Sequence, residues 1–112
     1  MDDDDRLRIV RASYRAYETG DRAALEALIA EDFTFRSPAD PGIDRATYFE
    51  RCWPNSENLR AFDVKRLVAI GEEVLVTYEA ERMDGSRFRN TEILGFDGER
   101  IARDEVDFGW NL

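Results

Sequence analysis

The chain has 112 residues, 43% of them hydrophobic and 12% aromatic, which is enough to build the core of a single domain spanning residues 1–112. Its formal net charge of −9 should repel nucleic-acid phosphates and anionic lipid, so we expect no nucleic-acid or membrane partner. The acidic N-terminus MDDDDRLR lacks the order of a signal peptide, which predicts a cytoplasmic protein.

The sequence contains no histidine and a single cysteine, Cys52. Catalytic triads that need histidine, the common zinc sites and an intrachain disulfide are therefore excluded. An all-carboxylate metal site stays open, but no calcium-loop spacing is present, and we expect neither a metal nor another cofactor. Because no histidine can activate Cys52, we interpret it as a small buried apolar residue rather than a nucleophile.

The N-terminal part of the chain has the pattern of two helices. Aspartates at the start favour the positive end of a helix over residues 5–19, which Gly20 ends. Asp21 is placed to cap a second helix over residues 22–30. The apolar face of the first helix consists of Leu7, Val10, Tyr14 and Tyr17.

A short strand is predicted over residues 33–35, followed by a loop over residues 37–42 that is dense in turn-forming residues. Asp44 opens a third helix, and Pro54 ends it. The apolar side of this helix is formed by Tyr48, Phe49, Cys52 and Trp53.

The remainder of the chain alternates in the manner of β-strands. We predict strands over residues 60–70, 74–83, 87–96 and 101–108, with hairpin turns at Asp84-Gly85 and Asp97-Gly98. Helices that precede a long antiparallel meander predict an α+β fold, with the helices on one face of a curved sheet.

The first hairpin allows a prediction of strand register. If Asp84-Gly85 is a two-residue turn, Thr77 lies opposite Glu92 and Glu79 lies opposite Asn90. Directly opposed residues share a face, so Thr77, Asn90 and Glu92 are predicted on one side of the sheet. If the register is shifted by one residue, residues predicted on the same face of the sheet would lie on opposite faces.

Two segments resemble the nuclear transport factor two-like superfamily, which includes ketosteroid isomerases and SnoaL-like polyketide cyclases. They are YRAYETGDRAALEALIAEDFTF near the start and GFDGERIARDEVDFGW near the end. The resemblance implies a cone, in which a strongly bent sheet wraps around helices and opens to a pocket at one end. It also implies a homodimer formed through the outer face of the sheet.

The same resemblance implies site residues. In ketosteroid isomerases the position matching Glu92 carries an acid that points into the cavity, stays protonated there and donates a hydrogen bond to the developing enolate. Asp104 has the same strand parity as Val106 and Phe108, which the resemblance places toward the pocket. Asp40 lies in the loop that passes the rim of the family's cavity.

Two positions depart from the isomerase pattern. Ser37, before Pro38, occupies the place of the isomerase general base, and a serine cannot fill that role. Asp40 could replace it only if the loop folds this residue inward. The isomerase oxyanion tyrosine falls on Ser13, with Tyr14 as its neighbour. The steroid isomerase site is therefore not reproduced, whereas SnoaL-like cyclases need only one pocket acid.

These observations predict a pocket for a small apolar, carbonyl-bearing ligand, with Glu92 as acid or oxyanion donor and Asp104 or Asp40 as base. The alternative is a non-catalytic ligand-binding or dimeric scaffold module. In that case Glu92 is a structural acid, either hydrogen-bonded inside the cone or paired with an arginine such as Arg60 or Arg103. The candidate ligand contacts are Tyr14, Phe33, Phe49, Trp53, Thr77, Asn90 and Phe108.

Overall fold

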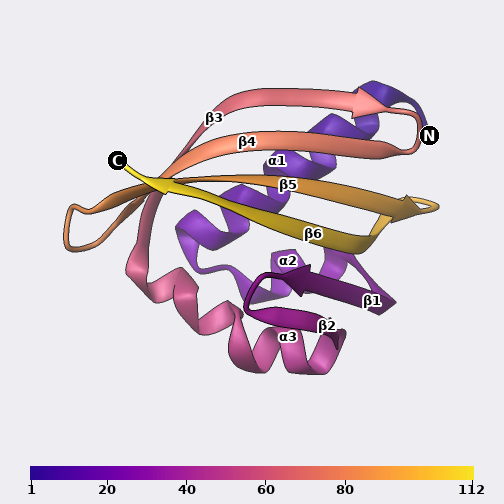
Figure 1. Cartoon of the computed structure of the whole chain (residues 1–112). Coiled ribbons are helices and arrows are strands. Elements are labelled where there is room, and N and C mark those ends of the chain that lie inside the picture. The colour runs from indigo at the N-terminus through magenta and orange to yellow at the C-terminus, as the bar shows by residue number, and fades with distance from the viewer.

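The computed structural model describes residues 1–112, which form three α-helices, one 3-10 helix and six strands (Figure 1). The helical elements are α1 (Asp3–Thr19), α2 (Arg22–Leu28), α3 (Arg45–Arg51) and the 3-10 helix η1 (Trp53–Asn58). The strands are β1 (Ile29–Ser37), β2 (Asp40–Asp44), β3 (Leu59–Ile70), β4 (Glu73–Arg82), β5 (Arg87–Asp97) and β6 (Arg100–Asn111).

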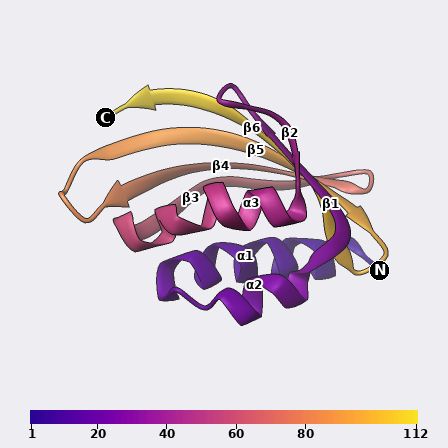
Figure 2. The same ribbon diagram turned by 90° about the horizontal axis from the view of Figure 1, so that it is seen from below.

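All six strands form one sheet in the order β2-β1-β6-β5-β4-β3. Every neighbouring pair is antiparallel except β1 and β6, which run parallel, so the sheet is mixed. The sheet is strongly bent, and α1, α2 and α3 lie against its concave side (Figure 2). The α+β prediction is confirmed, with the parallel pair as the one departure from an antiparallel sheet.

Three aspartates begin the three helices, because each side chain accepts a hydrogen bond from a backbone N–H that has no partner within the helix. Asp2 caps α1, Asp21 caps α2 and Asp44 caps α3. Gly20 ends α1 with a φ of 66°, a left-handed conformation that glycine adopts without steric cost. The predicted roles of Gly20, Asp21 and Asp44 are thus confirmed, and α1 starts two residues earlier than predicted.

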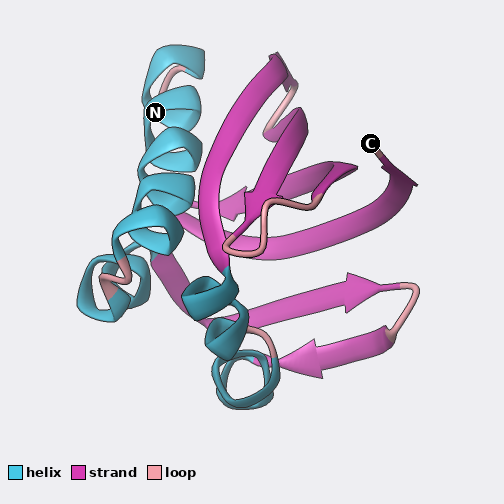
Figure 3. Cartoon of the chain, turned by 90° about the vertical axis from the view of Figure 1, so that its left-hand side faces the viewer, coloured by secondary structure: helices cyan, strands magenta, loops and turns pink.

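The core lies between the helices and the concave face of the sheet. Val10, Val74 and Val76 are completely shielded from solvent there. Tyr14 of α1 packs its ring against Tyr78 of β4, with ring centroids 5.2 Å apart. Helix α1 thus closes one side of the space that the bent sheet surrounds (Figure 3).

None of the helices is both long and apolar enough to cross a bilayer.

The predicted boundaries fail around the first strand and the third helix. Helix α2 ends at Leu28, and the next two residues already belong to β1. Of the predicted loop over residues 37–42, only Pro38 and Ala39 form a turn, because Ser37 ends β1 and β2 pairs back on β1 from Asp40. Pro54 does not terminate the helical region but lies in the first turn of η1, where its missing N–H would be unpaired in any case.

The predicted register of the β4–β5 hairpin is wrong by one residue. Val76 lies opposite Glu92, and Thr77 lies opposite Thr91. The turn is longer than a two-residue loop, since the Arg82 N–H donates to the Ser86 carbonyl at 2.8 Å. Three residues therefore connect the strands, the last of them Gly85 with a φ of 88°. The slip places Thr77 on the opposite face of the sheet from Glu92.

Candidate functional site

A cavity of about 810 Å³ opens between the helices and the concave face of the sheet. Thirty-one residues line it, and 18 of them are hydrophobic. Residues at its mouth, such as Trp110 and Phe108, are largely exposed, whereas Leu25, Phe33 and Ile101 deeper inside are almost fully buried. Size, concavity and a mainly apolar lining are features of small-molecule sites.

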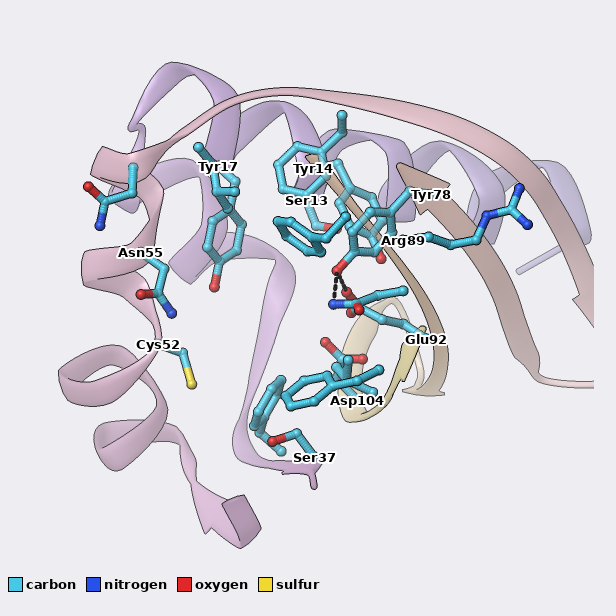
Figure 4. Close-up of a pocket in the computed structure, with 18 of the residues that line it drawn as sticks. Ser13, Tyr14, Tyr17, Ser37, Cys52, Asn55, Tyr78, Arg89, Glu92 and Asp104 are labelled. Atoms are coloured by element: carbon cyan, nitrogen blue, oxygen red, sulfur yellow. Dashed lines mark hydrogen bonds between the residues drawn. The ribbon is translucent and has the colours of Figure 1, made fainter. Parts of the chain in front are cut away.

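Two carboxyl groups face this cavity from neighbouring strands, Glu92 on β5 and Asp104 on β6 (Figure 4). Glu92 lies opposite Val106, and Asp104 lies opposite Leu94, so the two acids are diagonal neighbours on one face. Only 7% of Glu92 and 8% of Asp104 is exposed to solvent. The sheet therefore holds two ionisable groups side by side in a largely apolar space.

No arginine or lysine forms an ion pair with Glu92 or Asp104. The two candidate partners lie elsewhere: Arg60 pairs with Glu81 at 3.6 Å, and the Arg103 guanidinium lies over Gly95. Glu92 instead accepts a hydrogen bond of 2.6 Å from the Tyr78 hydroxyl. Pairing of Glu92 with Arg60 or Arg103 is therefore wrong. The other form of the structural alternative, a Glu92 hydrogen-bonded inside the cone, agrees with the Tyr78 contact.

Burial raises the pKa of both acids. For Asp104, burial and the neighbouring Glu92 charge raise the pKa well above its ordinary value. Burial also raises the pKa of Glu92, but the hydrogen bond from Tyr78 and the nearby polar groups of Asp104 and Tyr14 oppose this effect. The Tyr78 hydroxyl donates to Glu92 and favours its ionised form, whereas no comparable donor contacts Asp104, so Asp104 is the residue that keeps the proton when the pair holds one.

The buried polar atoms without a hydrogen-bond partner include two in the cavity wall that lie near Glu92, Asp104 Oδ1 and the Tyr14 hydroxyl oxygen. Tyr14 lies near enough to Glu92 to influence its pKa, yet the geometry falls outside that of a hydrogen bond. Leaving a buried polar group unpaired costs about 1–3 kcal/mol. Both atoms are available to a ligand that brings an acceptor.

A second polar group lies on another wall of the cavity, where the hydroxyls of Tyr17 and Tyr48 are hydrogen-bonded to each other. Figure 4 shows Tyr17 and Cys52 across the cavity from Glu92 and Asp104. Burial raises the pKa of the Cys52 thiol to about 11, so Cys52 stays a thiol at neutral pH.

Asp40, the other predicted base, lines the cavity but is engaged by neighbouring side chains. Its carboxylate pairs with the Arg51 guanidinium at 3.0 Å and accepts a hydrogen bond from the Ser37 hydroxyl at 3.1 Å. Strand β2 folds it inward, as a role in the cavity would require. Arg51 nevertheless occupies the Asp40 carboxylate, whereas Glu92 has no cation as a partner.

The predicted ligand contacts fall into two groups. Four of them line the cavity: Tyr14, Phe33, Asn90 and Phe108. The other three do not, and each has a different neighbour. Thr77 is on the outer face with Thr91, and Trp53 packs on Tyr17 with ring centroids 5.0 Å apart. Phe49 is held between the guanidinium groups of two arginines, Arg22 and Arg45.

The sequence interpretation did not find Tyr78, whose hydroxyl contacts Glu92. The register error placed this residue on the wrong face. A partial signal was present, because Val74, Val76, Tyr78 and Ala80 recur at every second position of β4 and are all buried, although the apolar Leu75 interrupts the alternation. Within the chain, no group of three or more His, Cys, Asp or Glu side chains is arranged to hold a metal ion.

The model of the SnoaL-like domain family matches residues 10–104, which is most of the chain. No curated protein sequence matches. Among solved structures, a candidate ketosteroid isomerase from Kribbella flavida DSM 17836 superposes with a TM-score of 0.80 at 19% identity, covering 95% of this chain and 78% of that one.

Two further structures have the same fold. An M. tuberculosis LEH-like epoxide hydrolase gives a TM-score of 0.79 at 17% identity, covering 94% of this chain and 83% of that one. A candidate polyketide cyclase from Sinorhizobium meliloti gives 0.75 at 20% identity, covering 88% of this chain and 93% of that one. At these identities the likeness concerns the fold.

Proposed function

Since this chain belongs to the family of SnoaL-like domains, we propose that it is a cofactor-independent acid–base enzyme acting on a small apolar carbonyl compound. One observation carries this proposal: Glu92 and Asp104 are buried side by side in an apolar cavity with no cation to neutralise them. Such a pair costs stability, and perturbed acids in a cavity are typical of catalytic sites.

The proposed roles follow from where the proton resides. Ionised Glu92 would remove a proton from the carbon next to the carbonyl group. Protonated Asp104 and the Tyr14 hydroxyl, whose atoms lack partners in the cavity, would donate hydrogen bonds to the carbonyl oxygen as it becomes an enolate. The captured proton then returns to a different carbon, which isomerises the substrate, or the enolate carbon attacks a second carbonyl of the same molecule.

This assignment reverses the roles that the resemblance implies, in which Glu92 is the acid. The hydrogen bond from Tyr78 stabilises the ionised form of Glu92, and no comparable donor contacts Asp104. Asp40 is not needed as the base, because Arg51 already pairs with it. The finer description of substrate, as an apolar ketone or polyketide, rests on the apolar lining and the unpaired hydrogen-bond donors.

Solvent deuterium exchange at the α-carbon of ketones tests the proposal directly, because exchange needs only the base and the oxyanion donors. The wild-type protein should accelerate exchange for at least one member of a panel of cyclic enones and diketones, followed by proton NMR. We expect Glu92→Gln and Asp104→Asn each to lower the rate by about 10²- to 10⁴-fold.

Asp107→Asn is the matched control, since Asp107 lies on the same strand as Asp104 but is exposed. It should retain the wild-type rate. The rate should rise with pH as Glu92 ionises and fall again as Asp104 loses its proton, giving a bell-shaped profile. A Glu92→Gln variant that exchanges at the wild-type rate, or a panel without any accelerated member, would overturn the acid–base proposal.

A further inference from the structure

A chain of three hydrogen bonds connects the mouth of the cavity to Glu92. The backbone N–H of Gly109, on β6, donates to Asn90 Oδ1 at 3.3 Å. Asn90 Nδ2 donates to the Tyr78 hydroxyl oxygen at 3.3 Å, and that hydroxyl donates to Glu92 Oε2 at 2.6 Å. Figure 4 marks the last two bonds at the Tyr78 hydroxyl with dashed lines.

The direction of each bond is fixed by the one before it. A backbone N–H can only donate, so the side chain of Asn90 must turn its carbonyl oxygen toward Gly109. Its amide NH₂ group must then point at Tyr78, which removes the usual ambiguity in the orientation of an asparagine amide. Because the Tyr78 oxygen accepts from Asn90, the single proton of its hydroxyl is directed to Glu92.

The first bond of this chain requires a close approach of two strands. A Cβ atom on Gly109 would lie 2.3 Å from the carbonyl oxygen of Arg89, which no other residue could tolerate without moving the strands apart. The β5–β6 register also shifts between Phe88 and Asn90, as expected at a β-bulge. Glycine and bulge together bring the Gly109 N–H to the Asn90 side chain.

We propose that Asn90 is a positioning residue that commits the Tyr78 proton to Glu92 and thereby keeps the proton of the carboxyl pair on Asp104. Without Asn90 the Tyr78 hydroxyl is free to rotate, and Glu92 loses part of the hydrogen bonding that stabilises its carboxylate. The catalytic meaning of this arrangement rests on the proposed function, whereas the position of the proton is a property of the free protein.

Titratable groups from several elements face Glu92 and must be followed together. They are Asp104 from β6, Tyr78 from β4, Tyr14 and Tyr17 from α1, Tyr48 from α3 and Cys52 after α3. The four tyrosines and Cys52 have a raised pKa and remain neutral below pH 8, since burial disfavours their charged forms. Changes in the titration of Glu92 between pH 3 and 8 therefore report on the carboxyl pair and its hydrogen bonds.

The experiment is a carboxyl ¹³C NMR titration of protein labelled at aspartate and glutamate, without any ligand. Glu92 is assigned from its missing signal in Glu92→Gln. We expect Asn90→Leu, which is close in size to asparagine, to raise the pKa of Glu92, and Tyr78→Phe to raise it further. In the Tyr78→Phe background, Asn90→Leu should cause no additional rise, because Asn90 acts through Tyr78.

Asn55→Leu is the matched control, since Asn55 lines the same cavity without contacting Tyr78, and it should leave the titration of Glu92 unchanged. If Asn90→Leu does not fold, Asn90→Ser serves instead, because a serine hydroxyl is too short to contact both neighbours. An unchanged Glu92 titration in the folded variant would overturn the inference, as would an equal shift in the Tyr78→Phe background.

This outcome is separable from that of the proposed function. A shifted titration together with no exchange of any ketone would support the positioning role and reject the enzyme. If exchange occurs, Asn90→Leu should move the low-pH limb of its rate profile upward in pH, in parallel with the NMR result. If Asn90→Leu lowers the exchange rate but leaves the low-pH limb of the profile in place, Asn90 has a structural role only.

Discussion

Glu79 and Glu92 lie on adjacent strands of one sheet but on opposite faces, and their surroundings differ completely. On the outer face, three cations surround Glu79: Arg87 at 3.1 Å, Arg89 at 3.3 Å and Lys65 at 3.9 Å. In the cavity, Glu92 has the hydroxyl of Tyr78 and a second acid as its neighbours. The same side chain is thus neutralised on one face and left charged or protonated on the other.

The difference shows that the inner acids are not placed there for stability. The sheet contains enough arginine and lysine to pair a glutamate, as the outer face demonstrates. Two buried carboxyls without a cation destabilise a fold, since desolvation disfavours each charge and the charges repel each other. Functional sites commonly contain residues that lower the stability of the fold, and the proposed function would explain the acid pair in this way.

Placing a cation in the cavity should have the largest effect, because it would make the inner face resemble the outer one. Val106 lies opposite Glu92, and its side chain is buried. We expect Val106→Lys to lower the pKa of both acids, so that both ionise, and to reduce ketone exchange by about 10²-fold or more. Carboxyl NMR titration and the exchange assay measure the two effects.

Ile93→Lys provides the comparison for that variant. Ile93 is next to Glu92 in sequence but faces outward, opposite Glu105 on β6. The added charge is the same and lies on the same strand, so its effect on the acid pair should be small. Equal changes in both variants would show that total charge, rather than the placement of the cation, governs the pair.

Removing one of the two acidic groups should stabilise the protein in a pH-dependent manner. The pKa of Asp104 is higher in the folded protein than in the unfolded chain, so the folded state binds the additional proton between those two values. The wild-type free energy of unfolding therefore falls as pH rises through that interval. Asp104→Asn lacks this loss and should be more stable by about 1–3 kcal/mol at pH 8.

Urea denaturation from pH 4 to pH 8 measures this effect, and the advantage of Asp104→Asn should vanish toward pH 4. The exposed Asp107→Asn should change the free energy of unfolding by less than about 0.5 kcal/mol at every pH. An Asp104→Asn variant that is less stable than wild type at pH 8 would mean that the acid pair stabilises the fold, as the ion pairs of Glu79 do on the outer face.

The smallest effect is expected on the outer face. Glu79→Gln leaves three cations near one another without their shared partner, and we expect a loss of about 1 kcal/mol in the free energy of unfolding. The loss should shrink in 1 M salt, where exposed charges are screened. A loss that exceeds the gain from Asp104→Asn would reverse the order of the two faces.

Most of the fold was predictable because its signals are local. Capping aspartates such as Asp21 and Asp44, the glycine at the end of α1 and the alternation in β3 to β6 each act over a few residues. The register of the β4–β5 hairpin was not predictable from Asp84-Gly85 alone, since the same pair fits a two-residue and a three-residue turn. That single ambiguity exchanged the faces of Thr77 and Tyr78.

Prediction of the site succeeded only partly, for a related reason. Asp104 could be placed by strand parity, and Glu92 through the family resemblance. The roles of Phe49 and Asp40 depend on arginines from other elements, Arg22 and Arg51 among them, and no local pattern announces such pairs. The homodimer, the cytoplasmic location and the identity of the ligand stay predictions.

The parallel pairing of β1 with β6 has a consequence for how the molecule is made. Strand β6, which carries Asp104, inserts between β1 and β5, although it is the last strand to leave the ribosome. Until then both neighbours present open edges, and the cavity has no wall on that side. Glu92 and Asp104 become neighbours only when β6 has paired with β5, and the β1–β6 pairing joins segments that are far apart in sequence. We therefore expect a chain whose β6 has not docked to expose the edges of β1 and β5 and to be prone to self-association.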